Sequence, residues 1–304
     1  MQDRIQAAVD EISQVLLGKE RQIRLAICCL LAGGHLLIED MPGMGKTTLA
    51  HALARVCGLD FNRIQFTSDL LPADILGVSI FEQGNGSFSF HPGPIFCQLI
   101  LADEINRATP KTQSALLEAM EEGQVSVEGQ TRSLPAPFFV IATQNPVSLA
   151  GTFPLPESQL DRFLMRIGIG YPDPKAEREL LARELNDRGA AIVQCLSVDD
   201  LVAMRQAANS VSLSPLLLDY VQRLIAYTRD NEIFQFGLSP RGGIAVVRAA
   251  RTWAFMEGRQ HALPEDVQAV LPAVVEHRLR ANTDAQGRTG AALVHRLLSE
   301  VDVF

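Results

Sequence analysis

The chain has 304 residues, of which 47% are hydrophobic and 20% are charged, an ordinary balance for a globular protein with a sizeable core. The formal net charge of −8 argues against nucleic acid as the default partner, although a local basic pore stays compatible with it. Five cysteines without a C-x-x-C pair indicate free thiols in a reducing compartment and argue against disulfides or a zinc site.

The start of the chain has no signal-peptide core. The longest apolar stretch, residues 25–38, is interrupted by Gly33 and Gly34 and is shorter than the roughly 18 residues that a membrane helix needs. We therefore expect a cytoplasmic protein without stable membrane insertion.

The first third of the chain predicts two helices and then a strand, a turn and a helix. Apolar residues recur at helical spacing before residue 34, and Gly18 separates a first helix from a second at about 20–31. Residues 35–40 form a short apolar strand, 42–46 a glycine turn, and 47–58 a helix. A second strand follows at 61–67. The pair Asn85-Gly86 between alternating apolar residues predicts a hairpin over 79–90.

The middle of the chain continues the alternation. Residues 96–104 form an apolar strand, and Thr109 and Pro110 are typical of the N-cap and first position of a helix that runs to Gly123. A second hairpin is predicted over 124–134, with its turn near Glu128-Gly129, and buried strands over 138–145 and 163–170. Buried strands that alternate with helices predict an α/β fold with a mostly parallel sheet.

Residues 171–177 are a proline-punctuated break, after which only helical patterns are predicted. We therefore predict two domains, 1–171 and 172–304.

Residues 38–50, IEDMPGMGKTTLA, nearly match the phosphate-loop signature G-x-x-x-x-G-K-[ST], but Asp40 stands where the first glycine belongs. Gly43 and Gly45 let the backbone fold so that amide N–H groups and the start of the next helix face a phosphate. Lys46 suits the β- and γ-phosphates, and the Thr47 hydroxyl suits Mg²⁺. The alternative is a chance glycine turn with a surface lysine, and the strand before and the helix after the motif argue against it.

Asp103 and Glu104 end the apolar strand that begins near residue 96, at the edge where ligands bind in open α/β sheets. Asp103 would reach Mg²⁺ directly or through water, and Glu104 would polarise the attacking water. Acids often end strands only to face solvent, but the phosphate loop upstream strengthens the functional interpretation. Asn145, at another strand end, is either a hydrogen-bonding partner of the water or γ-phosphate or a turn former before Pro146.

Two arginines complete the set of candidates. Arg162 can stabilise charge on a transferring phosphoryl group, in its own subunit or a neighbour's, or it pairs with Asp161 or Glu157. Arg241 lies in the first turn of a predicted helix, where a cation is disfavoured, so it either faces an anion or extends into solvent.

Taken in order, these motifs resemble the AAA+ ATPases and, within them, the MoxR family. The matching stretches cover nearly the whole chain: EDMPGMGKT, DLLPADILGVSIF, FHPGPIF, LADEINRATPKTQSALLEAMEEGQVSVEGQTRSLPAPFFVIATQNP, GTFPLPESQLDRFLMRI and LSPRGG. An acid before the loop is a habit of that family. The resemblance implies an AAA+ αβα sandwich with a five-stranded parallel sheet and β-hairpin inserts, followed by a small all-helical lid domain.

The resemblance also implies ATP and Mg²⁺ as cofactors and assigns the site. The nucleotide-binding residues would be Pro42, Gly43, Met44, Gly45, Lys46, Thr47 and Thr48, and the metal ligands Thr47 and Asp103. Glu104 would be the catalytic acid of Walker B, Asn145 sensor 1, Arg162 the arginine finger and Arg241 sensor 2. The two hairpins would be inserts that line the pore of a ring. The two glycines after Arg241 depart from the usual pattern and are expected to loosen that turn.

If Arg162 acts on a neighbour's nucleotide, hydrolysis needs a closed ring, which the family forms as a hexamer. The resemblance implies a chaperone-like ATPase that remodels a protein client and matures or activates partner complexes. The partners are often von Willebrand factor A domain proteins, and the roles include metal insertion.

The alternatives are a nucleotide-gated binding module with slow turnover, a chelatase-type ATPase subunit, and a helicase or clamp loader. The intact Glu104 argues against a binding module without turnover. No DNA-binding domain or basic tail supports a nucleic-acid partner, and the NRA and ATQNP stretches favour MoxR over the chelatase. The sequence leaves the role of Asp40 open.

Overall fold

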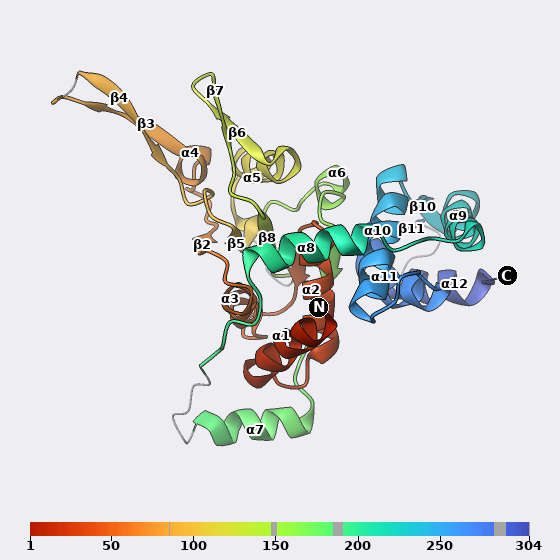
Figure 1. Cartoon of the computed structure of the whole chain (residues 1–304). Coiled ribbons are helices and arrows are strands. Elements are labelled where there is room, and N and C mark those ends of the chain that lie inside the picture. Colours follow the sequence, from red (N-terminus) through yellow and green to blue (C-terminus); the bar gives the residue numbers. More distant parts are fainter. Residues whose placement is uncertain (85, 147–150, 185–190, 283–289, 304) are drawn as a thin grey trace.

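A five-stranded parallel sheet forms the centre of the computed structural model, which describes residues 1–84, 86–146, 151–184, 191–282 and 290–303 (Figure 1). The strand order is β2-β5-β8-β1-β9, and every pairing in it is parallel. The strands are β1 (Leu36–Glu39), β2 (Phe61–Gln65), β5 (Leu99–Asp103), β8 (Phe139–Gln144) and β9 (Met165–Ile167). The predicted parallel sheet and its five strands are confirmed.

Helices cover both faces of this sheet, so side chains that alternate along a strand are buried on either side. In β1, Leu36 and Ile38 pack in one core with α1 (Gln2–Val15), α2 (Glu20–Leu31) and α3 (Lys46–Val56). Leu37 packs in the other core with α4 (Pro72–Leu76) and α5 (Pro110–Glu122). Burial on both faces explains why these strands are almost continuously apolar, and each buried side chain of this size contributes about 1.5–3 kcal/mol.

Two antiparallel hairpins project away from the sheet (Figure 1). The first joins β3 (Gly77–Glu82) to β4 (Ser87–Pro92), and the second joins β6 (Gln124–Val127) to β7 (Gln130–Ser133). Asn85 of the first predicted turn lies outside the described residues. The second turn falls at Glu128 and Gly129, both with positive φ, as predicted. On the first hairpin Phe81 and Phe88 are 50% and 72% exposed, with ring centroids 5.3 Å apart.

The remainder of the chain is mainly helical. Its helices are α7 (Pro174–Glu184), α8 (Val198–Asn209), α9 (Pro215–Asp230), α10 (Pro240–Met256), α11 (Pro264–Val275) and α12 (Gly290–Glu300). A short ribbon that the sequence patterns did not predict, β10 (Phe234–Phe236) with β11 (Arg280–Ala281), joins them. Within the described residues, no helix combines the length and apolar character needed to cross a bilayer.

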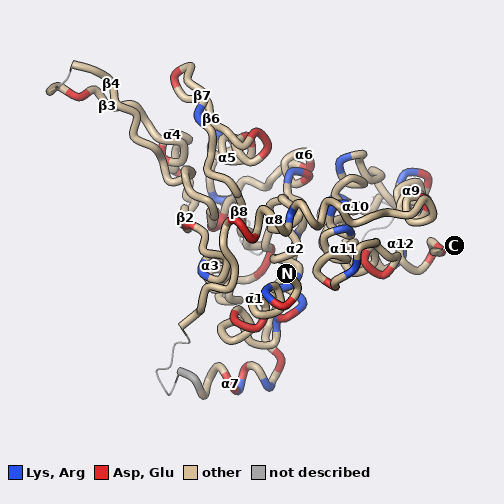
Figure 2. The backbone as a smooth tube through the Cα atoms, in the orientation of Figure 1, with Lys and Arg blue, Asp and Glu red and all other residues tan. Residues whose placement is uncertain are grey.

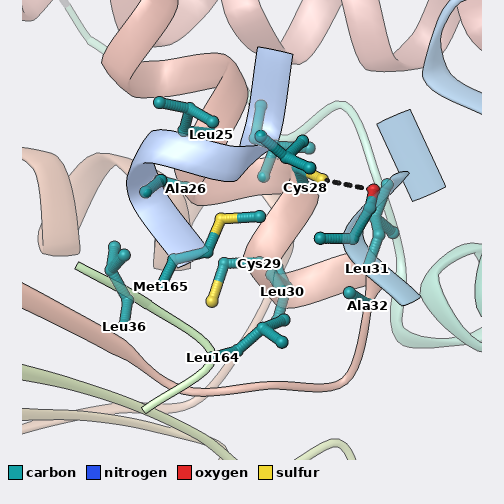
Figure 3. Close-up of a cluster of buried hydrophobic side chains, with 14 of the residues drawn as sticks. Leu25, Ala26, Cys28, Cys29, Leu30, Leu31, Ala32, Leu36, Leu164 and Met165 are labelled. Carbon is teal, nitrogen blue, oxygen red and sulfur yellow. Dashed lines mark hydrogen bonds between the residues drawn. The ribbon is translucent and has the colours of Figure 1, made fainter. Parts of the chain in front are cut away.

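The helical part packs directly on the sheet's own helices. The Cys28 thiol in α2 donates to the Ala249 carbonyl of α10 at 3.6 Å, within a core of leucine, alanine and methionine side chains (Figure 3). The neighbouring Cys29 is also fully buried, and burial raises its pKa to about 12. All five cysteines are free, as predicted, and burial keeps these two thiols protonated at neutral pH.

The two glycines near the start of α10 do not interrupt the helix, which runs unbroken from Pro240. Ser239 Oγ accepts a hydrogen bond from the Gly242 N–H at 3.0 Å and caps the first turn. A Cβ at Gly243 would lie 2.7 Å from Ile225 Cδ1, so the glycine allows α9 and α10 to approach closely.

His35 joins three elements at the start of β1. Its Nδ1 accepts a hydrogen bond from the Val140 N–H at 3.0 Å, so Nε2 carries the proton and donates to the Met120 carbonyl at 3.1 Å. The ring is 9% exposed, and burial lowers the pKa of His35 to about 4. Neutral His35 therefore ties the end of α5 to β8.

This pKa predicts a pH-dependent loss of stability. The folded state holds the His35 pKa below its ordinary value of 6.5, so the unfolded chain binds the extra proton. The contribution is complete above pH 6.5 and is lost as the pH falls toward 4, by about 3 kcal/mol in total. Urea unfolding between pH 7 and 4 measures how the free energy of unfolding changes with pH. For His35→Gln this slope should be smaller than for the wild-type protein, by the equivalent of about one bound proton. His51→Gln, at an exposed site, is the control; an unchanged slope for His35→Gln would contradict the prediction.

Candidate functional site

The loop between β1 and α3 has the geometry of an anion cradle. Gly43 and Gly45 adopt left-handed φ angles of 82° and 88°, and α3 begins at Lys46, so the first turn of this helix lines a cavity of about 350 Å³. Lys46 Nζ donates to the Asp40 carbonyl at 2.5 Å and to the Gln144 carbonyl at 3.5 Å. Partial burial lowers the pKa of Lys46. The cavity is lined by Pro42, Gly43, Gly45, Lys46, Thr47, Thr48, Asp103 and Glu104.

Asp40 turns its carboxylate away from this cradle. Oδ1 accepts from the Met41 N–H at 2.8 Å, and Oδ2 accepts from the Gly170 N–H at 2.6 Å. The carboxylate therefore binds backbone donors outside the cradle and does not line the cavity. Asp40 also fastens the loop to residue 170, where the chain leaves the sheet.

The two acids of β5 are held by side chains from neighbouring strands. Thr143 Oγ1 donates to Asp103 Oδ1 at 2.6 Å and accepts from the Glu104 N–H at 2.8 Å. Arg63 in β2 donates to Asp103 Oδ2 from Nε at 3.1 Å and from its terminal nitrogen at 2.6 Å. Glu104 has a left-handed φ of 56°, an uncommon backbone conformation for a residue with a side chain.

The Glu104 carboxylate is oriented in turn by Gln65 Nε2 at 3.2 Å and Arg107 at 2.9 Å. Thr143, Arg63 and Gln65 were not among the residues predicted from the sequence. Their contacts cross between strands. Thr143 is a polar residue near the carboxyl end of an apolar strand, whereas Arg63 and Gln65 belong to a strand of mixed polarity that gives no such signal.

A second pocket of about 240 Å³ adjoins the cradle and shares Gly43, Gly45 and Thr48 with it. Its other walls come from the turn between α1 and α2 and from the segment after β9, with Leu16, Leu17, Met44, Ile169 and Pro172 among them. Mostly apolar walls beside a phosphate cradle suit a nucleotide base. Of this pocket, the sequence predicted only the loop residues Gly43, Met44, Gly45 and Thr48 as nucleotide-binding residues. The other walls were missed because they come from distant segments, near residues 16 and 170.

Asn145 follows β8, next to the Gln144 carbonyl that contacts Lys46. Asn145 lines a neighbouring cavity of about 350 Å³, together with Arg166 and Arg280. Arg166 pairs there with Glu39 at 2.5 Å and with Glu276 at 3.1 Å, and so links the end of β1 to the end of α11.

Arg162 and Arg241 lie together, away from the cradle. Both pair with Glu121 at the end of α5, Arg162 at 3.0 Å through Oε2 and Arg241 through Oε1. They line a cavity of about 410 Å³ whose walls include none of the residues that line the phosphate cradle. Of the predicted site, the structure therefore brings Lys46, Thr47, Asp103 and Glu104 to one cavity and the two arginines to another.

A parallel sheet of this order, a glycine cradle facing two strand-end acids and a helical lid define an ATPase of the AAA+ class. Residues 35–165 match the model of the ATPase family associated with various cellular activities, and residues 226–297 match the AAA lid domain. YeaC of Bacillus subtilis is 43% identical over 97% of this chain and 93% of its own length. The chaperone MoxR1 of Mycobacterium tuberculosis is 41% identical over 92% of this chain and 77% of its own.

A solved structure agrees with these relatives. A Cytophaga hutchinsonii protein proposed to be an ATPase superposes with a TM-score of 0.91 at 37% identity, covering 99% of this chain and 95% of its own. The chain belongs to the MoxR family of AAA+ ATPases. It is an enzyme that hydrolyses ATP, as the sequence predicted.

The Asp40 hydrogen bonds are expected to stabilise the loop and the segment near residue 170. Asp40→Ala removes two charge-assisted hydrogen bonds and should lower the free energy of unfolding by about 2 kcal/mol. The freed segment near residue 170 also forms a wall of the apolar pocket, so the affinities for ATP and ADP should fall together. Urea unfolding and equilibrium nucleotide titration test both effects. Asp60→Ala, exposed just before β2, is the control, and an Asp40→Ala protein that matched it would show that the acid has no anchoring role.

Proposed function

We propose that this chain is a Mg-ATP-driven, chaperone-like remodeller that works as a closed ring, with six copies as in its family. The observation that carries the proposal is the separation of the two arginines from the cradle. Arg162 and Arg241 share Glu121 in a cavity on another side of the subunit. A neighbouring copy that presents this cavity to the cradle would complete the site, and head-to-tail contacts of that kind close into rings.

Within one cradle, the residues divide the work. The loop amides and Lys46 hold the β- and γ-phosphates, and the apolar pocket takes the base. The Thr47 hydroxyl and Asp103 carboxylate line one cavity, and they are oxygen ligands of the kind that Mg²⁺ accepts. When bound, Mg²⁺ neutralises charge on the phosphates. Glu104 orients and polarises the attacking water. The Glu104 N–H donates to Thr143 in β8, and Asn145 directly follows that strand.

The first hairpin supports contact with a protein client. Its exposed apolar side chains are Val78, Ile80, Phe81 and Phe88. Val78 and Ile80 lie on one face of the hairpin, and the paired Phe81 and Phe88 lie on the other. Exposed apolar groups on a projecting element are typical of protein-binding surfaces. The family resemblance supports von Willebrand factor A domain proteins as partners, with activation of partner complexes, metal insertion included, as the outcome.

Glu104→Gln tests the catalytic acid. The amide keeps the shape but cannot take up negative charge or accept a proton, so turnover should fall by about a hundred- to ten-thousandfold. ATP should still bind and remain unhydrolysed. Steady-state phosphate release and filter-binding of labelled ATP measure the two properties. Glu118→Gln, exposed on α5, should behave as wild type; full turnover by Glu104→Gln would overturn the assignment.

Mixed rings test the completion of one site by another subunit. Arg162→Ala alone should lose about three to five powers of ten in turnover, as for other arginine fingers. Lys46→Ala alone should also be inactive. Mixed together, the two variants should recover activity, because an intact arginine then meets an intact cradle. The control mixes Arg162→Ala with the double variant Lys46→Ala, Arg162→Ala, which has no arginine to offer; equal activity in both mixtures would refute the proposal.

A further inference from the structure

The cavity that holds Arg162 and Arg241 carries more positive charge than the two acids in it can neutralise. Its lining includes four arginines, Arg162, Arg241, Arg248 and Arg278, and the acids Glu121 and Asp161. Arg278 is already committed: it is 5% exposed, pairs with Asp161 at 2.7 Å and donates to the Phe163 carbonyl at 2.7 Å. Three arginines are therefore left to one carboxylate, which gives the cavity an excess of two positive charges.

The negative charge of Glu121 is unfavourable where it lies in its helix. It lies in the last turn of α5, where the carbonyl end of the helix dipole disfavours an anion. Figure 2 shows this acidic end of the helix, with basic residues at the start of α10. The two arginines offset the cost, one at each carboxylate oxygen. Glu121 is 35% exposed and Arg241 52%, so another anion can reach and replace this contact.

Arg248 extends the basic surface along α10. It lies seven residues after Arg241, two helical turns further along the same face, and both line the cavity. Among the described residues, no carboxylate or carbonyl forms an ion pair or hydrogen bond with its guanidinium group. An unpaired arginine beside two shared ones forms a surface suited to several phosphate oxygens, since the guanidinium fork binds phosphate at two points.

We propose that Glu121 occupies, in the lone subunit, the place of the phosphate groups of a neighbour's ATP, and that Arg248 is a third arginine for those phosphates. Assembly then exchanges one carboxylate for a polyphosphate of greater charge. Glu121 competes with the neighbour's nucleotide and weakens assembly, whereas Arg248 strengthens it. This inference rests on the proposed ring with a site completed between subunits.

The test measures ATP-dependent assembly by analytical ultracentrifugation in the Glu104→Gln background, where ATP persists. The added Glu121→Gln change should lower the protein concentration for half-assembly by about fivefold, the upper range for a partly exposed ion pair. Without nucleotide the midpoint should not fall, because no anion replaces the carboxylate. Glu122→Gln, the next residue in the same turn, is the matched control for the helix-end charge.

Arg248→Ala should raise the midpoint in ATP by about fivefold, and Arg248→Lys, which keeps the charge, should stay within roughly twofold of the parent. Circular dichroism and thermal unfolding check that each variant folds. A Glu121→Gln midpoint equal to or above the parent's overturns the competitor role, and an Arg248→Ala midpoint equal to the parent's overturns the third arginine. A parent that does not assemble in ATP at all overturns the proposed ring itself, and with it this inference.

Discussion

Parallel pairing of β1, β8 and β5 is the constraint from which the catalytic arrangement follows. Strands that run in one direction bring their carboxyl ends to the same edge of the sheet. The phosphate loop leaves β1 there, β5 ends there with Asp103, and β8 delivers Thr143 between the two acids. Lys46 reaches carbonyls from two of these strand ends at once. A strand in the opposite direction would remove one of these groups from the edge.

The features that the sequence predicted are those written in consecutive residues. Apolar runs predicted the strands, Glu128-Gly129 a hairpin turn, and GKTT after a strand the cradle, because each depends on local backbone preference. The features that it missed depend on residues far apart in the chain: the Thr143 and Arg63 contacts with Asp103, the apolar pocket, and the β10–β11 ribbon of three and two residues. No local pattern encodes which distant segments meet.

Arg241 is a residue whose environment the sequence predicted only in part. Its place at a helix start left two possibilities, an anion in front of it or extension into solvent, and the structure shows the anion, Glu121. The identity of that partner could not be read from the chain, because it depends on how α10 packs against α2 and the end of α5. The same packing holds Arg241 with Arg162 and apart from Lys46. The packing of α10 therefore decides which cavity Arg241 lines.

Asp40, the acid that replaces the first glycine of the loop, connects two points of the backbone. Its carboxylate accepts hydrogen bonds from the N–H of Met41, in the loop, and from the N–H of Gly170, where the chain continues toward the helical lid. A glycine would ease the turn but would leave these two points independent. With Asp40 present, the loop and residue 170 are joined through one carboxylate, so they cannot move apart without breaking a hydrogen bond.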